Sequence, residues 1–420
     1  MKKSTRKSKV SKIPYPSALI DKVENLEDEI RYENLPNWVN KLSSQYQQDY
    51  KQARRFLLEY KASIDTFNSY RRDIERLLQW CINIRHAAFP QLTRDDILTY
   101  VEFCEHPPSH WIAESSNVPR FIIKNAERIP NSEWRPFVVR VPKAQNKTAK
   151  ASQFKLSNNA IKALFRILSS FFRYLYEEDY ISANPVAKIR QKSRFVKKTV
   201  ETRLNRTLSD VQWLYVIDAA ETMADENPAS HERALFIMSA LYAMYLRISE
   251  LTETPRWTPT MNHFYKDSAN RWWFKTVGKG NKEREITVSD DMLRSLKRYR
   301  QHLGLTSLPN AQDNSPLIPK NRGTGGISST RQIRRIVQEC FDVAAERLME
   351  DGLQEDGDAL KAATVHWMRH TGISNDIQHR QREHVRDDAG HSSSAITDLY
   401  IDVEKKDRHK SGKKKQLVPS

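Results

Sequence analysis

The segment from His231 to Thr254, HERALFIMSALYAMYLRISELTET, constrains the fold most, because it is apolar on nearly all sides yet contains an arginine. A helix that is apolar all round is buried in a protein core. Arginine is rarely buried without an anion. Arg247 therefore needs a partner, and Glu250, one turn further along, is the nearest candidate. A purely structural ion pair and a functional arginine both remain open from this segment alone.

Two amphipathic helices accompany this segment in the second half of the chain. The first runs over residues 289–304, with Ser289 as its N-cap. The second runs over residues 329–348 and has basic residues suited to contacts with a DNA backbone. Its apolar stripe consists of Ile333, Ile336, Val337, Cys340 and Phe341, and its basic residues are Arg331, Arg334 and Arg335.

A β-hairpin is predicted over residues 272–288. Residues 272–277 and 285–288 have strand-like compositions, and the turn between them reads Gly278-Lys279-Gly280-Asn281. The predicted tip carries three cations, Lys279, Lys282 and Arg284. Such a tip is either solvated or held out on a narrow finger that enters a DNA groove, and both interpretations stay open.

Three helical patterns dominate the first half. Residues 66–84 form an apolar stripe with Arg71, Arg72 and Arg76 off it, and two further helices have Thr93 and Ser157 as expected N-caps. The first stripe consists of Phe67, Tyr70, Ile74, Leu77, Leu78 and Cys81, and the last of Ile161, Leu164, Leu168, Phe171, Phe172 and Leu175. This half is either a DNA-binding helical domain with basic outer faces or a bundle that only packs.

Together these patterns predict a mainly α protein with a small β-sheet or hairpin, in two domains. The first domain is helical and the second is α+β. The predicted boundaries are a basic, flexible tail over residues 1–35, a helical domain over 36–192 with an insertion at about 105–150, a linker over 193–206, a second domain over 207–404 and a basic tail over 405–420. The insertion has no predicted role, and the basic linker is either a clamp on a duplex or a solvated spacer.

The charge of the chain favours a polyanionic partner. Lys and Arg number 69 against 52 Asp and Glu, which gives a net charge of +17 over 420 residues. Such an excess attracts nucleic acid. No apolar run approaches the roughly 20 residues that span a bilayer, and no signal peptide is visible. The three cysteines lack metal-ligand spacing. We expect a cytoplasmic, nucleoid-associated protein without cofactor, metal or membrane contact.

Residues 364–400 concentrate the groups that suit chemistry on a phosphodiester. His366 and Arg369 lie three residues apart, Gly390-His391-Ser392 follows, and Tyr400 ends the stretch. Arginine supplies bidentate donors that keep their charge, and histidine transfers protons near neutral pH. Any one of these residues alone is more often structural than functional.

The ordered set of motifs resembles the tyrosine recombinase (phage integrase-like) family. The motifs are LYAMYLRISEL, VGKGNKER, HWMRHT, AGHSS and the tyrosine nine residues after that histidine. Upstream, SYRRDIERLLQW and AIKALFRILSSFFRYLYEEDYISANPV resemble the helical core-binding domain of that family. The resemblance covers roughly residues 37–400 and implies a core-binding domain followed by an α+β catalytic domain.

Carried over residue by residue, the resemblance implies six catalytic residues and one supporting residue. The six are Arg247, Lys279, His366, Arg369, His391 and the nucleophile Tyr400, and the supporting residue is Glu250. It implies a covalent 3′-phosphotyrosine intermediate and a free 5′ hydroxyl, so that strands rejoin without ATP or metal. It also implies double-stranded DNA and a homotetramer on two paired sites as partners, with accessory DNA-bending or directionality proteins.

The chain departs from the family pattern in four places. Residues 372–391 are unusually polar, Ala389 stands where leucine is common, residues 261–272 are an expected insertion, and the tail after Tyr400 is short and charged. Two rival functions stay open, a catalytically inactive DNA-binding relative and a type IB topoisomerase. The interpretation that we favour is the integrase or excisionase-type recombinase of a mobile genetic element.

Overall fold

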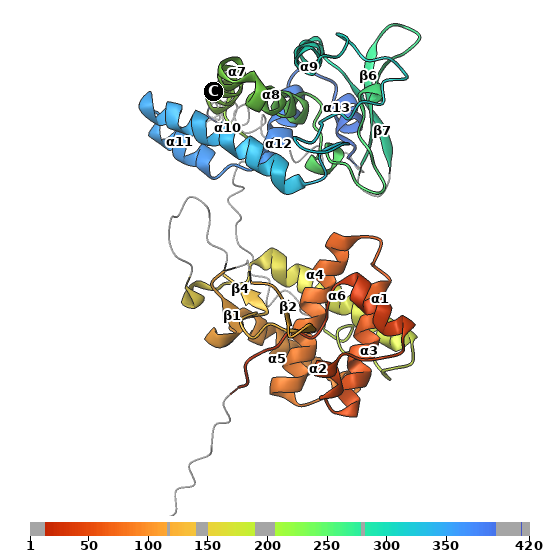
Figure 1. Cartoon of the computed structure of the whole chain (residues 1–420). Helices are drawn as coiled ribbons and strands as arrows, with labels where there is room; N and C mark the ends of the chain where they lie inside the picture. The colour runs from red at the N-terminus through yellow and green to blue at the C-terminus, as the bar shows by residue number, and fades with distance from the viewer. Residues whose placement is uncertain are drawn as a thin grey trace, which may run out of the picture. The chain divides into compact units, whose positions relative to one another are not determined.

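The structure is a computed structural model of the whole chain. It describes residues 13–115, 118–139, 150–189, 206–278, 282–391 and residue 413. Contacts between residues divide the chain into two compact units, residues 1–200 and residues 201–420, and each unit is described by itself (Figure 1). Helices dominate both units and the strands are short, which confirms the predicted fold class.

The first unit is a set of helices with two small strand pairs. Its helices are α1 (Val23–Arg31), α2 (Asn37–Asn40), α3 (Ser44–Leu58), α4 (Ile64–Trp80), α5 (Arg94–Glu105) and α6 (Asn158–Glu177). Strands β1 (Ile112–Ala113) and β4 (Phe137–Val138) pair in parallel, and β2 (Phe121–Lys124) and β3 (Glu127–Pro130) form an antiparallel hairpin. Within the described residues of the chain, no helix is both long and apolar enough to cross a membrane.

The predicted apolar stripes and N-caps of the first unit are confirmed. Most side chains of both stripes are buried in one core, with Tyr70 only partly buried at its edge. The hydroxyl of Thr93 accepts the N–H of Asp96 at 3.3 Å, and the hydroxyl of Ser157 accepts the N–H of Ala160 at 3.2 Å. These caps satisfy N–H groups that the first turn of a helix leaves without partners.

The predicted flexible tail over residues 1–35 is wrong for its described part. Residues 13–35 pack on the helical core, where Leu19, Ile20 and Leu26 are buried. Glu75 of α4 holds this segment on the core, and its side chain is almost fully buried. Its Oε1 accepts the backbone N–H groups of Leu19 at 2.6 Å and Ile20 at 2.9 Å. A buried carboxylate with such partners holds the segment in place.

The predicted insertion at about 105–150 is, in its described parts, a piece of the same core. Trp111 and Phe137 are fully buried there. Arg76, which the helical pattern places on an outer face, donates its Nε–H to the carbonyl of Pro136 at 2.8 Å and lies 4.4 Å from the ring centroid of Phe137. Arg71 likewise donates to the carbonyl of Asp21 at 2.8 Å. These two arginines therefore join parts of the unit instead of forming a basic outer face.

The second unit combines a helical layer with a three-stranded antiparallel sheet. Its helices are α7 (Asp210–Glu226), α8 (Pro228–Ala243), α9 (Asp290–His302), α10 (Thr330–Glu350), α11 (Gln354–Lys361), α12 (Val365–Asp376) and α13 (Arg382–Ala389), and its sheet has the order β5 (Phe264–Lys266), β6 (Trp272–Val277) and β7 (Glu283–Thr287). The N-cap at Ser289 and the apolar stripe of α10 are confirmed. The sheet lies at one edge of the unit, with α13 beside β7 (Figure 1).

One expectation about the neighbourhood of α8 needs correction. The helix is buried as predicted but ends at Ala243, before Arg247, because the chain turns at Tyr245 with a left-handed φ of +49°. Residues 261–272, the expected insertion, supply β5, which pairs with β6 along Phe264↔Phe274 and its neighbours. The alternation of residue types in this short strand is too brief to separate it from a loop. The predicted linker over 193–206 and the tail over 405–420 lie outside the described residues, apart from Arg206 and Lys413.

Glu75→Ala is expected to lower the free energy of unfolding by about 3–5 kcal/mol, because it leaves the charge of Arg120 buried without its partner and two N–H groups without an acceptor. Urea unfolding of the full chain followed by circular dichroism measures the loss. Glu24→Ala, at an exposed position on α1, is the control and should change stability by less than about 0.5 kcal/mol. A loss below about 1 kcal/mol in Glu75→Ala would contradict the role given to this carboxylate.

Candidate active site

Three segments of the second unit bring the candidate residues together. Arg247 and Glu250 lie in the turn and the short 3-10 helix (Ile248–Glu250) that follow α8. His366 and Arg369 lie one turn apart on α12, and His391 follows α13. Gly390 ends α13 with a left-handed φ of +62°, a conformation that glycine adopts without strain.

The carboxylate of Glu250 organises one side of the site. It is 1% exposed and accepts the N–H of Arg247 at 2.8 Å and Nη1 of Arg247 at 2.9 Å. The same carboxylate accepts Nη1 and Nη2 of Arg284 at 2.7 and 2.8 Å. One carboxylate therefore holds two guanidinium groups. Both contacts are strong, because each arginine makes charge-assisted hydrogen bonds to Glu250.

Arg284 is the residue that sequence reasoning placed wrongly. The pattern puts it on the hairpin tip, either solvated or held out toward a DNA groove, but its side chain is only 9% exposed. It lies on β7 opposite Thr276, two residues before the buried Ile286, and so faces the same side of the sheet as Ile286. This period of two is the signal in the sequence that identifies an inward side chain.

Arg369 forms the other side of the site and is 3% exposed. Its Nη1 donates to the carbonyl of Tyr245, and its Nη2 donates to the carbonyl of Ala389 at 2.5 Å. The left-handed turn at Tyr245 gives this carbonyl its position, and α13 gives that of Ala389. Arg369 therefore joins the turn after α8 to the residue before Gly390.

The polar segment after α12 forms an ion network behind the site. Arg380 bridges Asp376 at 3.0 Å and Asp388 at 2.5 Å, and Asp376 also accepts the hydroxyl of Tyr245. Asp388 accepts the N–H of Thr287 on β7 at 3.2 Å. The polarity that departs from the family pattern is therefore used to attach α13 to β7 and to the Tyr245 turn.

Three histidines near the arginines are neutral at pH 7. Burial, with Arg369 and Arg247 adding to it, lowers the pKa of His366 below its ordinary value. Burial and the same two arginines, followed by Arg284, lower the pKa of His391 to about 4. Burial and the neighbouring His366 lower the pKa of His370 to about 3, and the two rings lie 4.2 Å apart. Neutral imidazole is able to accept a proton as well as to donate a hydrogen bond.

Comparisons with known proteins point to one family. No family model matches the sequence. The tyrosine recombinase XerC of Thermodesulfovibrio yellowstonii is 26% identical over 324 residues, which cover 74% of this chain and 91% of that protein. The tyrosine recombinase XerC of Leptospira interrogans is 26% identical over 240 residues, which cover 57% of this chain and 66% of that protein.

The fold of the chain is similar to that of a solved recombinase structure. The crystal structure of the XerH site-specific recombinase bound to palindromic difH substrate superposes with a TM-score of 0.55 at 14% identity, over 95% of this chain and 98% of that chain. In sequence and fold the chain is similar to tyrosine recombinases. Tyrosine recombinases are DNA strand-transferring enzymes.

Four of the six residues that the tyrosine recombinase motifs mark lie in the described part of the chain, and these four gather around one region. Arg247 and Arg369 both influence the pKa values of His366 and His391. Lys279 and Tyr400 lie outside the described residues. Gly278, next to Lys279, donates its N–H to the carbonyl of Lys282 at 2.8 Å at the base of the hairpin.

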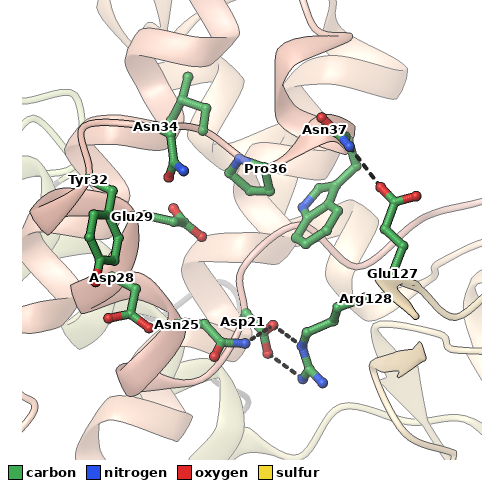
Figure 2. Close-up of a pocket in the computed structure, with 12 residues that line it drawn as sticks. Asp21, Asn25, Asp28, Glu29, Tyr32, Asn34, Pro36, Asn37, Glu127 and Arg128 are labelled. Carbon is green, nitrogen blue, oxygen red and sulfur yellow. Dashed lines mark hydrogen bonds and ion pairs between the residues drawn. The ribbon is translucent and has the colours of Figure 1, made fainter. Parts of the chain in front are cut away.

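A separate hollow of about 350 Å³ in the first unit is unsuited to nucleic acid (Figure 2). It is lined by four carboxylates, Asp21, Asp28, Glu29 and Glu127, against one lining arginine, Arg128. Arg128 is itself held by Asp21 at 2.8 Å. An acidic lining repels phosphate, so the cluster of the second unit is the better place for a DNA backbone.

Among the described residues no group of three histidine, cysteine or carboxylate side chains has the arrangement of a metal site.

Because the pKa values of these histidines are lowered, we predict that the free energy of unfolding decreases as the pH is lowered. The unfolded chain protonates these histidines near pH 6.5, whereas folded His391 does so only near pH 4, so the unfolded state gains protons first. The free energy of unfolding should therefore be fully present above pH 6.5 and decrease as pH falls toward 4. His391→Gln should reduce this decrease in urea unfolding at a series of pH values, and His302→Gln, at an exposed position of α9, is the control. An unchanged pH dependence in His391→Gln would contradict the burial assigned to this ring.

Proposed function

We propose that the chain is a site-specific DNA recombinase that cuts and rejoins DNA through a covalent 3′-phosphotyrosine at Tyr400. The observation that carries the proposal is the convergence of Arg247 and Arg369 with neutral His366 and His391 in one region. Fixed guanidinium groups and hydrogen-bond donors of this kind stabilise the charge that develops on a phosphate during in-line attack.

The two arginines have the task of binding the nonbridging oxygens of the scissile phosphate. Both are anchored before any DNA arrives, Arg247 by Glu250 and Arg369 by two backbone carbonyls. Anchored donors need little reorganisation when charge develops, so they favour the transition state over the ground state. Lysine at either place would keep the charge but lose the bidentate geometry.

His366 is the proposed acceptor of the proton of Tyr400. Tyrosine has an ordinary pKa near 10, so attack requires a base or a strongly cationic surrounding. Burial lowers the pKa of His366 and leaves it neutral at pH 7, the state that a base needs. His391, neutral for the same reason, donates a hydrogen bond to the phosphate.

The chemical step exchanges one phosphodiester bond of the DNA for a phosphodiester bond to Tyr400. The phenolate of Tyr400 attacks phosphorus, the bond to the 5′ oxygen breaks, and Lys279 protonates the departing oxygen. The phosphotyrosine conserves the bond energy, so attack by the 5′ hydroxyl of another strand reverses the step and rejoins DNA. No nucleotide or metal ion is needed to balance these steps.

The proposed assembly follows from this chemistry and from the positive charge of the chain. Double-stranded DNA is the substrate, and the net charge of +17 favours its binding. Exchange between two duplexes requires four cuts, so four copies of the chain act as a homotetramer on two paired sites. The tetramer acts in the nucleoid, and accessory proteins set the direction of exchange. We assign the enzyme to a mobile genetic element, on the length of the chain, residues 105–150 of the first unit and the polar motif flanks.

Tyr400→Phe is expected to bind DNA like the parent but to form no covalent adduct, because the attacking oxygen is missing. The measurement uses nicked duplexes from the genomic neighbourhood of the gene, incubated without metal and resolved on a denaturing gel. Cleavage sites at both ends of an inserted segment would support the mobile-element assignment, and a single chromosomal site would oppose it. An adduct in Tyr400→Phe would refute the nucleophile.

Two further assays, a native mobility shift and plasmid relaxation, separate the two rival functions. A salt-sensitive mobility shift without any adduct in the parent would indicate a DNA-binding relative that has lost catalysis. Relaxation of supercoiled plasmid lacking the cleaved site, by the monomer, would indicate a type IB topoisomerase.

Lys279→Ala is expected to cleave an all-oxygen duplex about 10²–10⁴ times more slowly, the range that general acid catalysis supplies. A duplex with a 5′-bridging sulfur at the scissile phosphate should restore its rate, because a thiolate leaves without a proton. Arg369→Lys is the comparison and should gain nothing from the sulfur, since its defect is in phosphate binding. Equal slowness of Lys279→Ala on both duplexes would rule out the general-acid role.

A further inference from the structure

Arg284, the last residue of the VGKGNKER motif, makes a two-point contact, although the resemblance assigns it no role. Its two terminal nitrogens meet the two oxygens of Glu250 separately, at 2.7 and 2.8 Å. Its remaining donor, the Nε–H, is buried and has no hydrogen-bond partner among the described residues. Glu250 is therefore the only polar partner that the described structure gives to this guanidinium.

The fork of Arg284 fixes the plane of the carboxylate that Arg247 depends on. Arg247 contacts Glu250 through its own N–H and through Nη1, and its side chain is 27% exposed. A carboxylate bound only by this partly exposed arginine would be able to rotate. The bidentate contact from Arg284 removes that freedom, because planar guanidinium and carboxylate groups align in one plane.

Arg284 also fills the space between two glycines that precede candidate catalytic residues. A Cβ on Gly390 would lie 2.8 Å from Cδ of Arg284, and a Cβ on Gly278 would lie 3.1 Å from its Nη1. Gly390 precedes His391, and Gly278 precedes Lys279. One side chain thus touches the base of the hairpin, the turn after α13 and the carboxylate that anchors Arg247.

We propose that Arg284 is a positioning residue that couples the hairpin, the Gly390 turn and Arg247 into one rigid site through Glu250. The inference rests on the proposed function, since it assigns Arg284 to the cleavage reaction. Arg284 acts through Glu250 and the two glycine contacts. Its charge alone does not suffice, because a lysine at this place would bind one carboxylate oxygen and leave the plane free.

The first test compares single-turnover cleavage in Arg284→Lys, Glu250→Gln and the double variant, on the nicked duplex that the parent cleaves. Arg284→Lys should lose about 100-fold in the cleavage rate, the effect of a misplacement near 1 Å, with DNA affinity unchanged. The double variant should be no slower than the slower single variant, because both changes break one contact. Arg271→Lys, at an exposed position before β6 on the same sheet, is the matched control and should cleave like the parent.

The second test needs no DNA and therefore separates this inference from the proposed function. Hydrogen exchange measured by mass spectrometry on the full-length protein should become faster over residues 272–288 and 386–391 in Arg284→Lys, while α10 stays as protected as in the parent. If the parent forms no adduct on any duplex, the proposed function fails and the exchange result alone decides the coupling.

Three results would overturn the inference. One is cleavage at the parental rate in Arg284→Lys, which would mean that charge alone is sufficient. Another is unchanged exchange in both segments, which would mean that Arg284 does not hold them together. The third is multiplicative losses in the double variant, which would show that Arg284 and Glu250 act separately.

Discussion

The buried carboxylate of Glu250 is the interaction on which the candidate site depends. It lies among positive groups, holding Arg247 and Arg284 by four hydrogen bonds. A carboxylate removed from water is stable only when its lone pairs are satisfied, and here two guanidinium groups and a backbone N–H do so. The surplus positive charge that remains, with Arg369 nearby, makes the region a place for an anion. Structural pairing and the proposed phosphate binding are therefore two consequences of one arrangement.

A second set of contacts links the elements that surround the site. Arg369 joins the Tyr245 turn to the end of α13 through two carbonyls, and Arg380 ties Asp376 to Asp388 behind it. Since Asp388 also accepts an N–H from β7, the sheet, α12 and α13 are linked by ionic and backbone contacts. A site built on such rigid connections is able to hold donors in place before substrate arrives.

Sequence reasoning predicted those features that depend on local pattern. The N-caps at Thr93, Ser157 and Ser289, the buried α8 and the hairpin strands follow from spacing and residue type alone. It failed where long-range contacts decide: Glu75 holds a segment 55 residues away, and Arg284 reaches back 34 residues to Glu250. No local pattern encodes such partners. The Arg247–Glu250 pair was accessible because its members lie one turn apart.

The most direct test of the account is to locate the covalent bond. The adduct trapped on a nicked duplex is digested with nuclease and trypsin and analysed by tandem mass spectrometry. Trypsin releases residues 387–405 as one peptide, which contains Tyr400 as its single tyrosine together with three consecutive serines, Ser392, Ser393 and Ser394. We expect a nucleotide joined through phosphate to Tyr400. A nucleotide on one of those serines, or on any other peptide, would contradict it.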